Sequence, residues 1–221
     1  MKVAVCGGKG GVGKSTVAFE LGAALGAVVV DGDLAMADLP AGRGPDLHDV
    51  LAGRASPLEA VRKSRGVRLL PCGRTLSGAR GADPAALEAA VDAVAREYGR
   101  VVVDCPAGLK ADVAMGLSAA DACVPVTTPA RSAVTDALRT RGAAVALDAG
   151  LARVALNRCG GDPPVAAVER AFGAPCVTIP ESEHLAGGVT ASRPAVRTAA
   201  ASSAATALDT LARGVAACFD E

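Results

Sequence analysis

Residues 8–16 read Gly8-Lys9-Gly10-Gly11-Val12-Gly13-Lys14-Ser15-Thr16, and they directly follow the apolar run Val3–Cys6. The spacing G-x-x-x-x-G-K-[ST] is typical of a loop that holds phosphate between a first strand and a first helix. Glycines let successive backbone N–H groups turn toward a phosphate, and the helix start adds the positive end of its dipole. The sequence therefore predicts a nucleotide site formed by residues 8–16, with the charge of Lys14 on the phosphates and the Ser15 hydroxyl on Mg²⁺.

Two further segments end in carboxylates where a parallel sheet would place them beside that loop. The apolar run 27–30 ends at Asp31-Gly32-Asp33, and the run 100–103 ends at Asp104. Ligands of open α/β sheets gather at the carboxyl ends of the strands. We therefore expect Asp33 and Asp104 to act near Mg²⁺ or on an attacking water, and a turn-capping role is the alternative for the aspartates at 31 and 33.

Three motifs together resemble the MinD/ParA family of ATPases with a deviant Walker A loop. They are the loop with its additional lysine, Lys9, the D-x-D at 31–33, and the D-C-P-A-G at 104–108. The resemblance covers essentially the whole chain. It implies one domain, residues 1–221, with a doubly wound α/β fold: a mostly parallel sheet of about seven or eight strands with helices on both faces.

The resemblance also implies roles for residues, and these are expectations carried over from the family. ATP or ADP with Mg²⁺ would be the cofactor, and the ATP-bound form would be a homodimer that an activating protein partner acts on. Lys9, Lys14 and Asp33 would be catalytic, with Lys9 reaching the nucleotide of the apposed subunit and Asp33 orienting the water. Ser15, Asp33 and Asp104 would form the Mg²⁺ shell. The nucleotide would also contact the following four residues: Asn157 at the adenine edge, Arg158, Pro180 and Glu181.

Three cellular roles remain open at this stage, and we favour spatial positioning of a division site or a similar cargo. A partition ATPase that binds DNA non-specifically would need a basic surface. Residues 111–221 instead hold nine arginines, no lysine and eleven acidic residues, a net of −2. A metallocentre ATPase similar to the nitrogenase iron protein would use Cys105 as a cluster ligand, but no second cysteine stands near it in sequence.

Membrane association is not indicated by the sequence. No uninterrupted apolar stretch approaches the ~20 residues of a spanning helix, and the first residues lead straight into a strand without a signal peptide. We therefore expect a cytoplasmic protein. The predicted last helix, residues 198–219, carries Arg213 as its one cation. This argues against intrinsic membrane binding, because a membrane-surface helix is rich in Lys and Arg.

Composition and local pattern add three structural expectations. The chain is 51% hydrophobic but only 2% aromatic, which predicts an aliphatic core. Residues 74–82 are rich in Gly and Ser and are predicted to form a mobile loop. His48 lies on a predicted helix far from the other histidine, and we expect it at the surface or at the boundary of the core.

Overall fold

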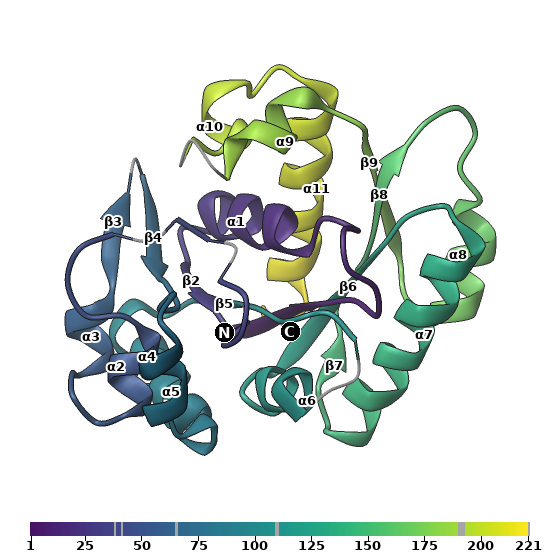
Figure 1. Cartoon of the computed structure of the whole chain (residues 1–221). Coiled ribbons are helices and arrows are strands. Elements are labelled where there is room, and N and C mark those ends of the chain that lie inside the picture. The colour runs from purple at the N-terminus through teal and green to yellow at the C-terminus, as the bar shows by residue number, and fades with distance from the viewer. Residues whose placement is uncertain (38, 41, 65, 109–110, 190–192, 221) are drawn as a thin grey trace.

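A nine-stranded sheet forms the centre of the molecule (Figure 1). The computed structural model describes residues 1–37, 39–40, 42–64, 66–108, 111–189 and 193–220. The strand order is β3-β4-β2-β5-β1-β6-β8-β9, with β7 paired to β6. The strands are β1 (Lys2–Cys6), β2 (Val28–Asp31), β3 (Arg62–Ser64), β4 (Val67–Leu70), β5 (Val101–Asp104), β6 (Ala122–Thr127), β7 (Gly150–Leu151), β8 (Val154–Cys159) and β9 (Cys176–Pro180).

Every strand pair except β3–β4 is parallel, so the predicted mostly parallel α/β sheet is confirmed. The sheet has more strands than the predicted seven or eight. The unpredicted ones are the charged, partly exposed edge strand β3 and the two-residue β7, and neither has the buried apolar run that marks a parallel strand in sequence.

Helices cover both faces of the sheet (Figure 1). On one face lie α1 (Lys14–Leu25), α9 (Glu183–Gly188), α10 (Ala195–Thr198) and α11 (Ser203–Ala217). The other helical segments are α2 (Leu47–Leu51), α3 (Pro57–Ala60), α4 (Leu76–Gly81), the 3₁₀ turn η1 (Pro84–Ala86), α5 (Leu87–Tyr98), α6 (Ala111–Ser118), α7 (Arg131–Ala146) and α8 (Val165–Phe172).

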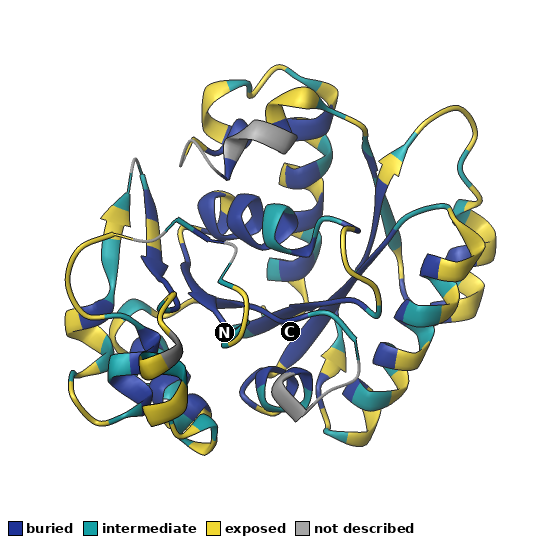
Figure 2. Cartoon of the chain, in the orientation of Figure 1, coloured by how far each residue is buried: buried dark blue, intermediate teal, exposed yellow. Residues whose placement is uncertain are grey.

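The central strands are buried (Figure 2), and their alternate residues belong to two different cores. On β1, Val3 and Val5 pack with the residues of α1 and α11, whereas Ala4 and Cys6 pack with those of α2, α5 and α6. This is the period of two that a strand buried on both faces produces. The core is aliphatic, as predicted: Phe19 and Phe172 are the aromatic members among its largest fully buried side chains.

Two sequence predictions are wrong. Residues 76–81 of the predicted mobile loop form helix α4, whose N-cap Thr75 accepts a hydrogen bond from the N–H of Gly78. A Thr cap offsets the weak helix propensity of a glycine-rich segment. His48 is not at the surface: its side chain is only 2% exposed, because the short helix α2 turns that face toward β4 and the loop after β2.

The last helix packs onto the domain as expected. Leu208, Leu211 and Val215 of α11 are fully buried in the core that also contains the α1 residues. The predicted helix 198–219 is shorter in the structure: α10 ends at Thr198, and α11 begins at Ser203, after its N-cap Ser202. In the described part of the chain, no helix has both the length and the apolarity that crossing a bilayer requires.

Candidate nucleotide-binding site

The loop of residues 8–16 joins β1 to α1 at the carboxyl edge of the sheet. Gly11 and Gly13 have positive φ angles of 78° and 96°, which a residue with a Cβ rarely adopts. An added Cβ at Gly10 or Gly11 would meet no atom within 4 Å, so the space beside these two glycines is open. The first turn of α1 begins directly after Gly13. Backbone N–H groups and a helix start therefore surround a space that suits phosphate.

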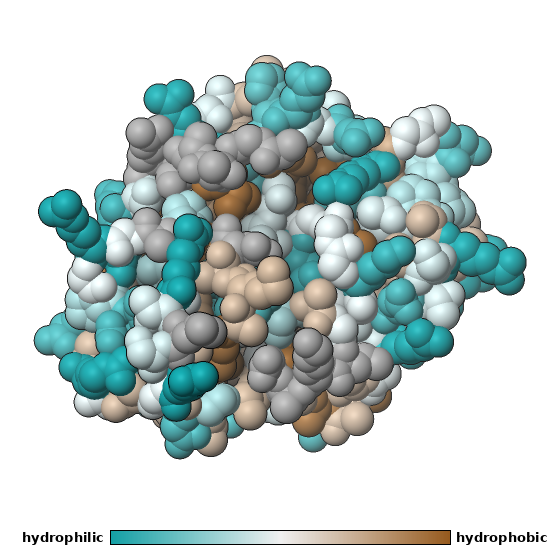
Figure 3. All heavy atoms as spheres, in the orientation of Figure 1, coloured by the Kyte–Doolittle hydropathy of each residue, from teal (hydrophilic) through white to brown (hydrophobic). Residues whose placement is uncertain are grey.

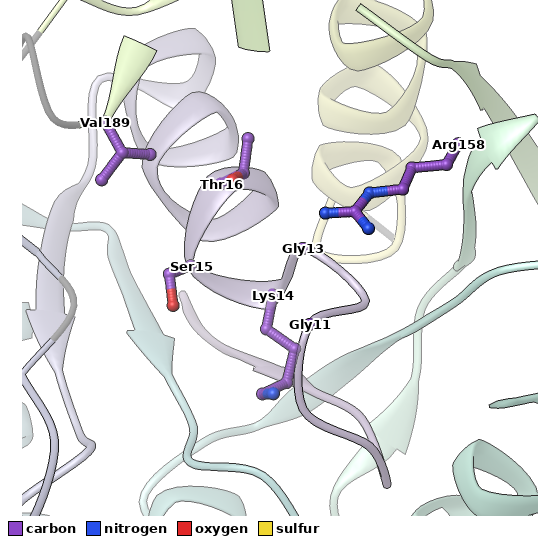
Figure 4. Close-up of a pocket in the computed structure, with 7 residues that line it drawn as sticks. All are labelled: Gly11, Gly13, Lys14, Ser15, Thr16, Arg158 and Val189. Carbon is purple, nitrogen blue, oxygen red and sulfur yellow. The ribbon is translucent and has the colours of Figure 1, made fainter. Parts of the chain in front are cut away.

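A cavity of about 260 Å³ adjoins this loop (Figure 4). Its lining consists of Gly11, Gly13, Lys14, Ser15, Thr16, Arg158 and Val189. The Lys14 side chain is 8% exposed, and its Nζ donates a hydrogen bond of 3.4 Å to the carbonyl of Lys9. The Lys9 side chain is exposed. Lys14 therefore lies in the cavity beside the loop, while Lys9 projects into solvent.

Oxygen donors suited to Mg²⁺ stand beside the loop. Ser15 lies in the first turn of α1, and Asp104 ends β5, which pairs with β1. The Asp104 carboxylate is 1% exposed. Hydroxyl and carboxylate oxygens are the ligands that this hard cation prefers, so the residues present fit a nucleotide with its Mg²⁺.

Asp31 and Asp33 occupy different environments in the loop after β2. Asp31 pairs with Asp104 across β2 and β5 and is fully buried. Its burial raises its pKa to about 7, although it accepts hydrogen bonds of 3.3 Å from the N–H groups of Asp33 and Leu39. Asp33 is half-buried, and its Oδ1 accepts the N–H groups of residues 35 and 36 at 3.3 and 2.9 Å. Asp33 lies at the same sheet edge as the phosphate loop, but it does not line the cavity beside that loop.

A second cavity of about 270 Å³ shares Gly13, Thr16 and Arg158 with the first. Its other lining residues are Asn157, Pro180, Glu181, Ser182 and Leu185. All four residues that the resemblance assigned to the nucleotide outside the loop therefore gather here. The two cavities adjoin, and we interpret them as the phosphate half and the base half of one site.

Arg158 reaches the phosphate loop because of an irregularity in its strand. The β8–β9 pairing shifts register between Asn157 and Cys159, and Arg158 there has a positive φ of 56°. Figure 4 shows its guanidinium directed from β8 toward Gly13. A left-handed conformation at a non-glycine residue is uncommon and often marks a functional position. The exposed guanidinium is well placed to contact a bound phosphate or ribose.

Two residues of the predicted loop, Gly8 and Val12, do not place their side-chain positions in the cavity. Gly8 does not line the cavity but packs against α7, since an added Cβ would lie 2.1 Å from the carbonyl oxygen of Asp136. The Val12 side chain belongs to the core, and only its backbone faces the site.

Sequence reasoning did not identify Val189 and Leu185 as lining residues. They are single apolar residues, Leu185 in α9 and Val189 directly after it, and they carry no sequence signal of a ligand contact.

Cys105 is a buried thiol that packs against Gly116. Its burial, with the Asp104 carboxylate beside it, raises its pKa. Within the described residues, no group of three or more His, Cys, Asp or Glu side chains is arranged to hold a metal ion.

Comparisons with known proteins agree with this geometry. Residues 3–190 match the CobQ/CobB/MinD/ParA nucleotide binding domain. An uncharacterised ATP-binding protein of Methanocaldococcus jannaschii is 35% identical over 173 residues, which cover 73% of this chain and 66% of that protein.

Two solved structures are similar over nearly the entire chain. The cell division ATPase MinD of Pyrococcus furiosus is 30% identical and superposes with a TM-score of 0.92, covering 98% of each chain. The septum site-determining protein MinD of Pyrococcus horikoshii, solved as a complex with Mg-ADP, is 30% identical with a TM-score of 0.90 and covers 97% of this chain and 95% of its own.

Proposed function

The chain belongs to the CobQ/CobB/MinD/ParA family of nucleotide-binding domains, and on this premise we propose that it is an ATP-hydrolysing switch. In this proposal ATP with Mg²⁺ brings two copies together, and hydrolysis to ADP and phosphate releases them. The observation that carries it is the loop of residues 8–16, whose open glycine cradle, buried Lys14 and adjoining cavity have the chemistry of a nucleoside triphosphate site.

Each step has a residue suited to it. Lys14 and the loop N–H groups bind the phosphates, and the Ser15 hydroxyl and the Asp104 carboxylate hold Mg²⁺. Asp33 orients the attacking water with its carboxylate. Thr16 contacts the α-phosphate, and the amide of Asn157 reads the adenine edge with Arg158, Pro180 and Glu181 beside it.

Lys9 supports the dimeric form of the switch. Its ammonium is exposed in the single chain, although it lies between glycines that wrap the phosphates. A second copy placed against this face would put Lys9 close to the partner's terminal phosphate, where a cation stabilises the developing charge.

A positioning role in the cell is the biological context that we propose. The similarity to MinD proteins at 30% identity favours it. The acidic balance of residues 111–221 gives no support to DNA binding by that half of the chain.

The decisive experiment uses Asp33→Ala, which should bind ATP without hydrolysing it. Light scattering after size exclusion should give a dimer with ATP and Mg²⁺ and a monomer with ADP. The wild-type protein should release phosphate from ATP. Lys9→Ala in the Asp33→Ala background is the matched control, and it should bind ATP but remain a monomer. A wild-type chain that neither binds nor hydrolyses ATP in the presence of Mg²⁺ would contradict the proposal. So would an Asp33→Ala chain that remains a monomer with ATP.

A further inference from the structure

One buried polar side chain has no part in the nucleotide chemistry described above. It is His48, in helix α2, and its ring is 98% buried between α2, the end of β4 and the loop after β2. The polar atoms of a buried imidazole are expected to form hydrogen bonds, so the partners of this ring indicate what it holds in place.

The ring contacts the loop that carries Asp33. Its Nε2 lies 3.0 Å from the carbonyl oxygen of Leu34, the residue that follows Asp33. Because a carbonyl oxygen only accepts, Nε2 must carry the proton of this bond whatever the charge of the ring. By this one hydrogen bond, His48 connects the loop to helix α2, which begins 13 residues after Leu34.

A second contact joins the same ring to the segment just after β4. The Sγ of Cys72, just after β4, lies 3.2 Å from Nε2 of His48. The carboxylate of Asp31, at the end of β2, accepts the N–H groups of Asp33 and Leu39. The Asp33 loop is thus held at its N–H groups by Asp31 and at one carbonyl by His48.

Space lies beside the His48 contact. A cavity of about 200 Å³ lies there, lined by Leu34, Ala35, Met36, Ala37, His48, Gly73, Arg74, Thr75 and Ala79. Met36 is 73% exposed, and the surface view of this face shows apolar side chains in its middle between hydrophilic flanks (Figure 3). Among the described residues, no group bonds Nδ1 of His48, so Nε2 is the side of the ring that anchors the loop.

We propose that His48 is a positioning residue for ATP hydrolysis, acting through the carbonyl of Leu34 to keep the Asp33 carboxylate in its productive orientation. This inference rests on the proposed function, in which Asp33 orients the water. The anchor is made of a single bond beside open space, so the loop can be held in one state of the switch and released in another. The phosphate loop is on separate elements, so nucleotide binding does not depend on the anchor.

Three substitutions at one position separate positioning from packing. In His48→Gln the amide nitrogen occupies the place of Nε2 and can still donate to Leu34, whereas in His48→Asn it occupies the place of Nδ1 and cannot. His48→Phe keeps the ring and has no donor. Asn and Phe should lower kcat about five- to tenfold, the effect of losing one buried hydrogen bond, while Gln should stay within about twofold of wild type. For all three, the KM for ATP and the Kd for ADP should change less than about twofold.

A fourth variant, Gly73→Ala, displaces the imidazole ring while residue 48 remains histidine. An added Cβ at Gly73 would lie 2.6 Å from Nδ1 of His48 and 2.7 Å from a carboxylate oxygen of Asp46. Gly73→Ala should therefore displace the ring and lower kcat in the same way as His48→Asn. Thermal unfolding of each variant shows whether the assay temperature lies well below its Tm.

Hydrogen exchange of nucleotide-free protein gives a readout that does not depend on hydrolysis. The amides of Ala35 and Met36, which bond Asp33, should exchange about five- to tenfold faster in His48→Asn than in wild type, and His48→Gln should restore their protection. Equal kcat and exchange in Asn, Gln and wild type would overturn the inference, as would equal losses in Asn and Gln. If the wild-type protein failed to hydrolyse ATP, the proposed function would fail, while the exchange experiment would still decide whether His48 anchors the loop.

Discussion

The side-chain amide of Asn157 donates a hydrogen bond of 2.9 Å to the carbonyl oxygen of Val12, across 145 positions of sequence. Asn157 is 5% exposed and ends the apolar part of β8, and Val12 lies inside the phosphate loop. The residue proposed to read adenine thus also braces the loop that we propose holds the phosphates. Its Nδ2 donates to the Val12 carbonyl, and its Oδ1 is the atom that can accept a hydrogen bond from a base.

Asn157→Ala should weaken ADP binding about tenfold, because the buried Val12 carbonyl loses its donor and the loop loses its brace. Asn157→Asp should weaken it further, since a carboxylate oxygen would face the carbonyl oxygen. Titration calorimetry with ADP and Mg²⁺ measures both. A Kd within twofold of wild type for Asn157→Ala would show that the loop holds its shape without this bond.

Gly13→Ala should destabilise the fold by about 2 kcal/mol, because φ there is 96° and an added Cβ would lie 2.3 Å from Nδ2 of Asn157. Gly10→Ala is the matched control, since its Cβ would meet nothing within 4 Å. Its unfolding free energy should stay within about 0.5 kcal/mol of wild type. Urea denaturation of nucleotide-free protein compares the two, and equal effects would count against the role given to Gly13.

The two lysines of the loop should separate binding from catalysis. Lys14→Ala should lower ADP affinity about tenfold to a hundredfold, because a largely buried cation is removed from the phosphate cavity. Lys9→Ala should bind ADP within about threefold of wild type and yet lose most of its phosphate release. Fluorescent ADP titration and a phosphate assay measure the two properties. An equal loss of ADP binding in both variants would mean that Lys9 serves its own subunit.

Asp31 should make the nucleotide-free protein less stable as the pH rises. Its folded-state pKa is raised from 3.8 to about 7 by burial, so the folded chain retains a proton that the unfolded chain releases above pH 4. Between these values the unfolded state binds fewer protons, and the unfolding free energy falls with increasing pH. Relative to Asp31→Asn, wild type should lose about 2 kcal/mol between pH 5 and pH 7. Denaturant titrations at both pH values test this, and a difference that is constant or grows in favour of wild type contradicts it.

Glu20 should be essential for the segment that leads into the last helix. Its buried carboxylate accepts the N–H groups of Ala195 and Val196 at 2.8 and 3.1 Å, which joins α1 to α10. Glu20→Gln replaces one acceptor oxygen with a donor and should cost about 1–3 kcal/mol of unfolding free energy. The exposed Glu97→Gln is the control and should change stability by less than about 0.5 kcal/mol. Similar stabilities of the two variants would show that the carboxylate is dispensable.

The parts of the protein that were predicted correctly have local signatures. Residues 8–16 combine glycines, a lysine and a hydroxyl at a fixed spacing, and the strands that end at Asp31 and Asp104 are short β-branched runs. Buried parallel strands and a phosphate loop need these residue types in this order, so a single stretch of chain is enough to identify them. The family membership and the α/β fold followed from such stretches.

Other features could not be predicted because they depend on neighbours that are distant in sequence. Helix α4 forms where glycine and serine indicated a loop, because its cap and its packing against α2 outweigh propensity. His48 has no local pattern that distinguishes a surface histidine from a buried one, and its burial became clear only with β4 and the Asp33 loop around it.

The central parallel strands, the phosphate loop and the carboxylates at the strand ends could be recognised from short stretches of sequence, because each is encoded by the chemistry of adjacent residues. The packed chain was needed to show that Asn157 braces Val12, that burial raises the pKa of Asp31 to about 7, and that His48 contacts the loop of Asp33. Burial and hydrogen-bond partners belong to the packed arrangement of segments, and a buried polar atom acquires its partner only when those segments meet.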